Sequence, residues 1–133
     1  MVVWDTGSDM LLLESSECGN CYGDVFEIED SDTFAWDSGS YTQQYMDGTS
    51  LTGDWATDDA CVTESDAGSC GTGYKFAALT RQSGLGENED GILGMWSGNS
   101  SDADQDVMFM NYLAASGDIS MKTFSFYMTG LDG

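Results

Sequence analysis

The residues best suited to chemistry lie near the start of the sequence, where Asp5-Thr6-Gly7-Ser8 follows the strand-forming run Val2-Val3-Trp4. An aspartate can act as a general acid or base when its carboxylate is held rigidly. The apolar run 10–13 comes next, so the pattern predicts a strand, a tight turn and a second strand. The same four residues are also typical of an ordinary β-turn. Their meaning therefore depends on the rest of the chain.

The elements expected to position this aspartate are mostly strands. Asp47-Gly48 predicts a hairpin over 41–55, and a second hairpin around 61–70 returns through a strand at 74–79. A short apolar strand is expected at 90–94, a helix at 104–116 and a final strand at 124–128. Asp37-Ser38-Gly39 has the composition of a second catalytic triplet, but it lies only six residues before Tyr45, and we interpret it as a turn.

Several segments, in the right order, resemble motifs of the pepsin family of aspartic proteases. Residues 2–8 look like the active-site motif of that family, and residues 26–34 are similar to its F-x-P-x-x-S-x-T-F segment. Residues 45–53 resemble the flap, often Y-G-D-G-S-x-x-x-G, and residues 90–95 resemble the D-G-I-L-G-L segment. The expected helix and the strand at 124–128, similar to F-S-x-Y-L, follow them. The resemblance spans Val2 to about Leu131.

The resemblance implies an all-β fold, a pepsin-like acid protease lobe. Such a lobe has mixed orthogonal β-sheets, a ψ-loop, a flap hairpin and one short helix. The resemblance also implies that residues 1–133 are a partial N-terminal lobe of a bilobal enzyme. The first strands of that lobe and a second lobe with its own D-T/S-G motif would then lie outside this chain.

The resemblance further implies an endopeptidase in which water is activated between two aspartates that share a proton. Asp5 would be one of the two, Ser8 would hydrogen-bond it, and Thr6 would tie the lobe to its partner. A flap would close over an extended peptide substrate. The flap residues would be Tyr45, Asp47, Gly48 and Thr49, the motif glycine Gly7, and the substrate-pocket residues Val3 and Ile92. No metal or other cofactor is expected.

Three departures from the family pattern keep other functions open. Leu12 stands where a tryptophan usually supports the flap tyrosine, Met46 replaces the flap glycine, and Ile28 replaces the proline of the F-x-P segment. One alternative is a non-catalytic pepsin-fold protein that binds polypeptides or inhibits an enzyme. Another is a homodimeric retropepsin-like protease, and a third is a disulfide-bonded all-β surface protein without a catalytic cleft.

The four cysteines form two local pairs, Cys18 with Cys21 and Cys61 with Cys70. Two disulfides are the favoured interpretation, and Cys18–Cys21 also matches a small disulfide loop of the family. A four-cysteine zinc site is the alternative. Disulfides and a glycosylation sequon at Asn99 favour a secreted protein or an acidic vacuolar or lysosomal compartment. The chain shows no signal peptide, so any targeting signal is expected outside it.

The charge is strongly negative. Three Lys and Arg residues face 24 Asp and Glu residues, which gives a formal net charge of -21. This balance argues against nucleic-acid binding, because no basic patch can be built from three cations. Either an acidic compartment or high salt would relieve the self-repulsion. Hydrophobic residues make up 41%, enough for a core, but no apolar run is long enough for a membrane span.

Overall fold

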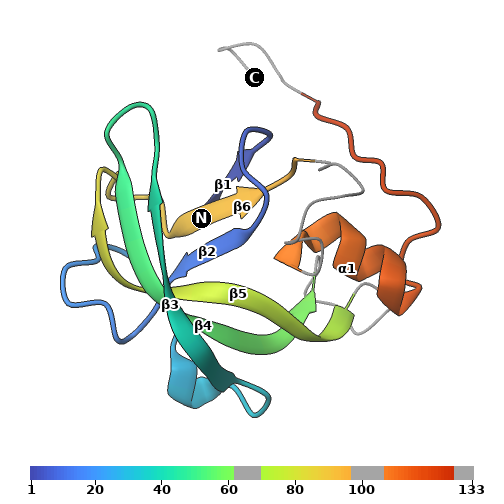
Figure 1. Ribbon diagram of the computed structural model, residues 1–133, viewed down its shortest axis with the longest axis horizontal. Coiled ribbons are helices and arrows are strands. Elements are labelled where there is room, and N and C mark those ends of the chain that lie inside the picture. Colours follow the sequence, from blue (N-terminus) through green and yellow to red (C-terminus); the bar gives the residue numbers. More distant parts are fainter. Residues whose placement is uncertain (62–69, 97–106, 128–133) are drawn as a thin grey trace.

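The strands form one curved, mixed six-stranded sheet with a single helix packed beside it (Figure 1). The computed structural model describes residues 1–61, 70–96 and 107–127, with Cys70 described by its backbone alone. The strand order is β1-β6-β2-β5-β4-β3. The elements are β1 (Val2–Asp5), β2 (Leu11–Glu14), η1 (Ile28–Asp30), β3 (Ala35–Gln44), β4 (Ser50–Cys61), β5 (Cys70–Ser83), β6 (Gly91–Gly94) and α1 (Phe109–Ser116). The predicted all-β class is confirmed, with the described strands joined in one sheet.

The ψ-loop is formed by β6, which lies between β1 and β2. It runs parallel to β1, with Asp5 opposite Gly94, and antiparallel to β2. Both ends of β6 are glycines because the neighbouring backbone leaves no room for a side chain. A Cβ at Gly91 would overlap the carbonyl of Leu12, and one at Gly94 would overlap the backbone of Asp9 and Met10.

Two long hairpins build the rest of the sheet. Strands β3, β4 and β5 pair antiparallel, and register shifts interrupt both ladders, which lets the long strands bend. The predicted turn at Asp47-Gly48 joins β3 to β4, with Gly48 at a φ of 95°. The Tyr45 N–H donates to the Thr49 carbonyl at 2.8 Å, which closes this turn. Both predicted hairpins are confirmed.

The apolar core has two parts, one on each side of the ψ-loop. The first packs α1 against the sheet through Phe109, Leu113, Tyr74 and Phe76. The second lies beneath the β3–β4 hairpin and contains Leu12, Leu51, Leu79 and Ile92, among others. The buried Tyr74 hydroxyl donates to the Val107 carbonyl at 2.6 Å and so connects the approach to α1 with β5.

The C-terminal third differs from the sequence prediction. The helix begins at Phe109, because Met108 is extended (φ -76°, ψ 118°), while residues 104–106 lie outside the described part of the chain. The glycine cap is as predicted, with Gly117 at a φ of 87°. The predicted strand at 124–128 is wrong for residues 124–127, which pair with none of the described strands. Phe126 instead packs edge-on against Trp4, with ring centres 6.1 Å apart.

The predicted Cys18–Cys21 disulfide is present, so the four-cysteine zinc site is wrong. Cys61 is also disulfide-bonded, and its backbone lies opposite Cys70 across the β4–β5 hairpin. The Cys70 side chain and Asn99 lie outside the described residues. None of the described helices is long and apolar enough to cross a membrane.

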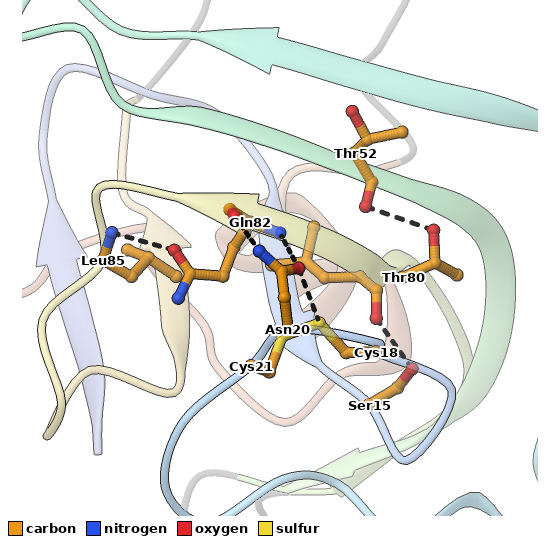
Figure 2. Close-up of a disulfide and its surroundings, with 9 residues drawn as sticks. Ser15, Cys18, Asn20, Cys21, Thr52, Thr80, Gln82 and Leu85 are labelled. Atoms are coloured by element: carbon orange, nitrogen blue, oxygen red, sulfur yellow. Dashed lines mark hydrogen bonds between the residues drawn. A yellow bond between two sulfur atoms is a disulfide. The ribbon is translucent and has the colours of Figure 1, made fainter.

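The disulfide loop is docked on β5 by the side chain of Asn20 (Figure 2). Its amide nitrogen donates to the Gln82 carbonyl at 2.6 Å, and its amide oxygen accepts the Gln82 N–H at 3.1 Å. The Gly19 N–H donates to the Thr80 carbonyl at 3.2 Å, and the Ser15 hydroxyl donates to the Leu79 carbonyl at 2.8 Å. The loop therefore satisfies backbone groups along the last part of β5.

We predict that Asn20→Ala destabilises the fold by about 1–3 kcal/mol, because two partly buried backbone groups of Gln82 lose their partners. Urea unfolding of both proteins measures the difference. Asn88→Ala, at an exposed asparagine, is the control and should leave the midpoint within experimental error. Equal midpoints for Asn20→Ala and the parent would contradict the docking role.

A buried carboxyl stands at the end of β2. Glu14 is only 1% exposed, and neither of its carboxyl oxygens has a hydrogen-bond partner. Burial raises the pKa of Glu14 above its ordinary value of 4.5, and the nearby backbone N–H of Tyr22 and terminal amine of Met1 offset only part of that rise. Compared with the unfolded chain, the folded protein therefore shifts the equilibrium of this carboxyl toward its neutral form.

We predict that Glu14→Gln makes stability less dependent on pH. A raised folded-state pKa means that the folded protein holds its proton more tightly than the unfolded chain. The stability of the parent should therefore fall as pH rises from 4.5 through the folded pKa, and then level off. Urea unfolding across this range should show a shallower fall for Glu14→Gln, whereas the exposed-site control Glu17→Gln should follow the parent. Parallel curves for all three proteins would refute the prediction.

Candidate active site

Asp5 is half-buried at the C-terminal end of β1, and its surroundings fix it through the backbone. Its Oδ1 accepts the Gly7 N–H at 2.8 Å, while its carbonyl accepts the Met95 N–H at 2.7 Å. The Ser8 carbonyl accepts the Trp96 N–H at 2.9 Å. Both ends of the Asp5 turn are thus fastened to the chain leaving β6, and Oδ2 has no donor among the described residues.

Ser8 does not make the expected bond to Asp5. The buried hydroxyls of Ser8 and Tyr45 have no hydrogen-bond partner among the described residues. Burial raises the pKa of Tyr45; the nearby Ser8 hydroxyl counters part of the rise, and the negative charges of Asp5, Asp9 and Asp47 add to it. The two hydroxyls lie near each other, but their positions do not meet the geometry of a hydrogen bond. They are polar atoms that a bound peptide or water could satisfy.

One cavity of about 270 Å³ brings together most of the residues predicted for the site. It is lined by Val3, Asp5, Tyr45, Asp47, Thr49, Gly84, Leu85, Glu89 and Ile92. The predicted catalytic aspartate, three predicted flap residues and both predicted pocket residues therefore meet in one place. The pairing of β1 with β6, which sets Val3 opposite Ile92, explains this convergence.

The cavity also contains Gly84, Leu85 and Glu89, which the sequence analysis missed. Glu89 lies two residues before β6, and Leu85 follows the end of β5. The one feature of the sequence that could have indicated these three residues is that they come shortly before the Asp90-Gly91 motif. The remaining predicted residues lie nearby: Thr6 is exposed in the turn after β1, and Gly48 is exposed at the hairpin tip.

A second cavity of about 420 Å³ also includes Tyr45 in its lining. It is lined by Gly7, Ser8, Asp9, Gln43, Gln44, Tyr45, Met46 and Trp96. Because Tyr45 lines both cavities, the two cavities are neighbours at the hairpin. The arrangement has the form of a groove that could receive successive side chains of an extended peptide.

The flap hairpin packs on the core even though Leu12 and Met46, two of the three departures from the family pattern, lie at or near it. Leu12 is 1% exposed and belongs to the core cluster against which Tyr45 packs. Thr49 is buried at the base of the hairpin, directly against Gly84, where a Cβ would overlap it. Met46 is fully exposed, so it replaces the family glycine without disturbing the core.

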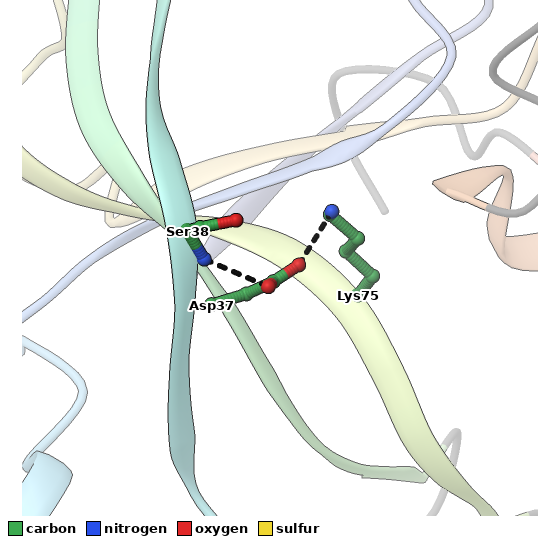
Figure 3. Close-up of polar contacts among 3 residues, drawn as sticks. All are labelled: Asp37, Ser38 and Lys75. Carbon is green, nitrogen blue, oxygen red and sulfur yellow. Dashed lines mark hydrogen bonds and ion pairs between the residues drawn. The ribbon is translucent and has the colours of Figure 1, made fainter.

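The Asp37-Ser38-Gly39 triplet lies within β3, at the register shift between Trp36 and Ser40, so its interpretation as a turn is wrong. Asp37 accepts the Ser38 N–H at 2.7 Å and pairs with Lys75 at 2.6 Å (Figure 3). The Lys75 ammonium, together with the Ser38 N–H, lowers the pKa of Asp37. The same ammonium lies 5.1 Å from the centre of the Trp55 ring. These contacts tie β3 to β5, and Asp37 lines neither cavity beside Tyr45.

Comparison with known families decides the relationship. The model of the eukaryotic aspartyl protease family matches residues 1–132. The chain belongs to this family. A search of curated proteins found no match. Membership in the aspartyl protease family confirms the resemblance drawn from the motifs, and it agrees with the all-β fold and its ψ-loop.

We predict that Gly94→Ala lowers the free energy of unfolding of this aspartyl protease domain by about 1–3 kcal/mol, because the new methyl group must displace the backbone at Asp9 and Met10. Gly19→Ala is the matched control, since a Cβ there meets nothing within 4 Å. Urea unfolding compares the two variants, and backbone amide NMR shifts at residues 5–10 report the loop. If Gly94→Ala has the stability of the parent and unchanged amide shifts at residues 5–10, then the backbone does not leave Gly94 as little room as we infer.

Proposed function

We propose that this chain supplies one catalytic carboxylate, Asp5, to an acid endopeptidase whose second aspartate lies outside it. The observation that carries the proposal is the cavity in which Asp5 meets the flap and the apolar pocket residues. In this proposal, residues 1–133 form most of an N-terminal lobe, and a second lobe completes the cleft. The protein would work in a secreted or acidic vacuolar or lysosomal setting, which the disulfides and the buried Glu14 favour.

The proposed reaction is hydrolysis of a peptide bond by water. Two carboxylates a few Å apart share one proton, because both cannot ionise easily. The ionised carboxylate takes a proton from water as the water attacks the scissile carbonyl carbon, while the protonated one donates a hydrogen bond to the carbonyl oxygen. The tetrahedral intermediate then collapses: the C–N bond breaks, the leaving amine nitrogen takes the proton removed from water, and a carboxylic acid and an amine are released. The Gly7 N–H holds Asp5 Oδ1 in place, which leaves Oδ2 for the water or the partner carboxyl.

The flap would supply water exclusion and substrate alignment. Its turn is rigid locally, because Asp47 accepts the Thr49 N–H at 2.9 Å and the Tyr45 N–H bonds the Thr49 carbonyl. An extended peptide lying between this hairpin and the Asp5 turn would place successive side chains in the two cavities beside Tyr45. The buried hydroxyls of Tyr45 and Ser8 would gain partners there.

We predict that Asp5→Asn in the full-length protein lowers kcat for cleavage of denatured protein by at least about 1,000-fold, because the amide cannot take a proton from water. Activity is measured between about pH 3 and 5. Asp37→Asn is the matched control, since Asp37 is an exposed aspartate in the structural triplet. Full activity in Asp5→Asn would refute the proposed role.

The chain 1–133 alone separates the proposal from a retropepsin-like homodimer. We expect no turnover by the purified chain, because it carries one of the two carboxylates. Turnover that rises with the square of chain concentration and disappears in Asp5→Asn would favour the homodimer. A full-length protein that binds peptides without cleaving them would favour the non-catalytic alternative.

A further inference from the structure

The cavity beside Asp5 combines apolar walls with negative charge. Val3, Leu85 and Ile92 provide the apolar surface, and Asp5, Asp47 and Glu89 provide three carboxylates. A purely apolar substrate side chain would contact the apolar walls. It would also remove water from the carboxylates without offering them a polar partner. A long side chain with an aliphatic stem and a cationic end matches both parts of the lining.

None of these carboxylates has a cationic partner in the described part of the chain. Asp5 and Asp47 accept backbone N–H groups of Gly7 and Thr49, and Glu89 Oε2 accepts the Gly86 N–H at 2.7 Å. The described ion pairs lie elsewhere, between the Met1 amine and Asp90 and between Lys75 and Asp37. The described residues therefore leave room for a cation supplied by a bound ligand.

The two carboxylates away from the reaction centre are well placed to hold such a cation. The Thr49 N–H and hydroxyl lower the pKa of Asp47, so it keeps its charge further into the acid range. Glu89 is half-buried, also lines the cavity, and its Oε2 accepts the Gly86 N–H, while Oε1 has no donor among the described residues. Tyr45 lines the same cavity, and its buried hydroxyl has no partner in the described part of the chain.

We propose that this cavity selects a lysine or arginine side chain of the substrate peptide and that Glu89 is the residue that determines this specificity. The proposal rests on the proposed function, because it places the peptide in the Asp5 cleft. The aliphatic stem of the basic residue lies along Val3 and Ile92, and its charged end pairs with Glu89. Asp47 closes the cavity from the flap side.

The decisive comparison uses two peptides that differ at one residue, lysine or methionine, at the position that occupies this cavity. With full-length protein, Glu89→Gln should lower the ratio of kcat/KM for the lysine peptide to that for the methionine peptide by about 10- to 100-fold. The substituted amide retains an oxygen for the Gly86 N–H, so the local fold is preserved. Glu87→Gln, at an exposed glutamate outside the cavity, is the control. An unchanged ratio in Glu89→Gln would overturn the proposal while leaving the endopeptidase function intact.

Binding to the chain itself tests the same inference without catalysis. Amide NMR titration of chain 1–133 should show tighter binding of the lysine peptide, weakened by salt and by Glu89→Gln, with shifts centred on residues 84–89. If the full-length protein cleaves neither peptide, the endopeptidase function fails and this titration alone decides the specificity. Equal binding of both peptides, or shifts unaffected by Glu89→Gln, would overturn it.

Discussion

The structure depends on one short strand whose two end residues lie too close to the neighbouring backbone to carry a side chain. Strand β6 lies between β1 and β2, and at Gly94 its backbone is in direct contact with the backbone of Asp9 and Met10. The hydrogen bonds from Met95 and Trp96 hold the Asp5 turn from that same position. A chain with any larger residue there would have to open the loop that carries the carboxylate. The geometry of the site is therefore set by backbone packing.

Electrostatics sets the second constraint, because cations are scarce. Among the described residues, Lys75 pairs with Asp37 and lies over Trp55, so it links β5 to β3 and β4. The carboxylates near Asp5 are consequently stabilised by backbone N–H groups, which fix their positions without cancelling their charge. Glu14 has no hydrogen bond at either oxygen among the described residues, and burial raises its pKa. The excess of acid also leaves the cavity beside Asp5 without a cationic partner in the described part of the chain.

The sequence predicted local features well because each carries its own chemical signal. Asp47-Gly48 specifies a hairpin, glycines bracket β6, and the Cys18–Cys21 spacing fits a short disulfide loop. Glu89 was missed because it reaches the cavity from the connection between β5 and β6, whose path over the sheet has no local sequence signal. The strand expected at 124–127 failed because strand-forming residues still need a neighbour with free backbone groups. The bond expected between Ser8 and Asp5 failed because the Gly7 N–H occupies Asp5 Oδ1 while Ser8 lies beside Tyr45.

The disulfide loop and the cavity beside Asp5 are connected through Gln82. Asn20 holds the backbone of Gln82, and the Gln82 side chain accepts the Leu85 N–H at 3.2 Å (Figure 2). Leu85 lines the cavity, and the intervening Gly84 lies directly against Thr49 at the base of the flap. A loop remote from Asp5 in sequence and chemistry therefore sets the position of one cavity wall and one end of the flap. Because Gln82 is only 3% exposed, water cannot replace these hydrogen bonds unless the end of β5 opens. The rigidity of this cavity wall therefore depends on the contact between the disulfide loop and β5.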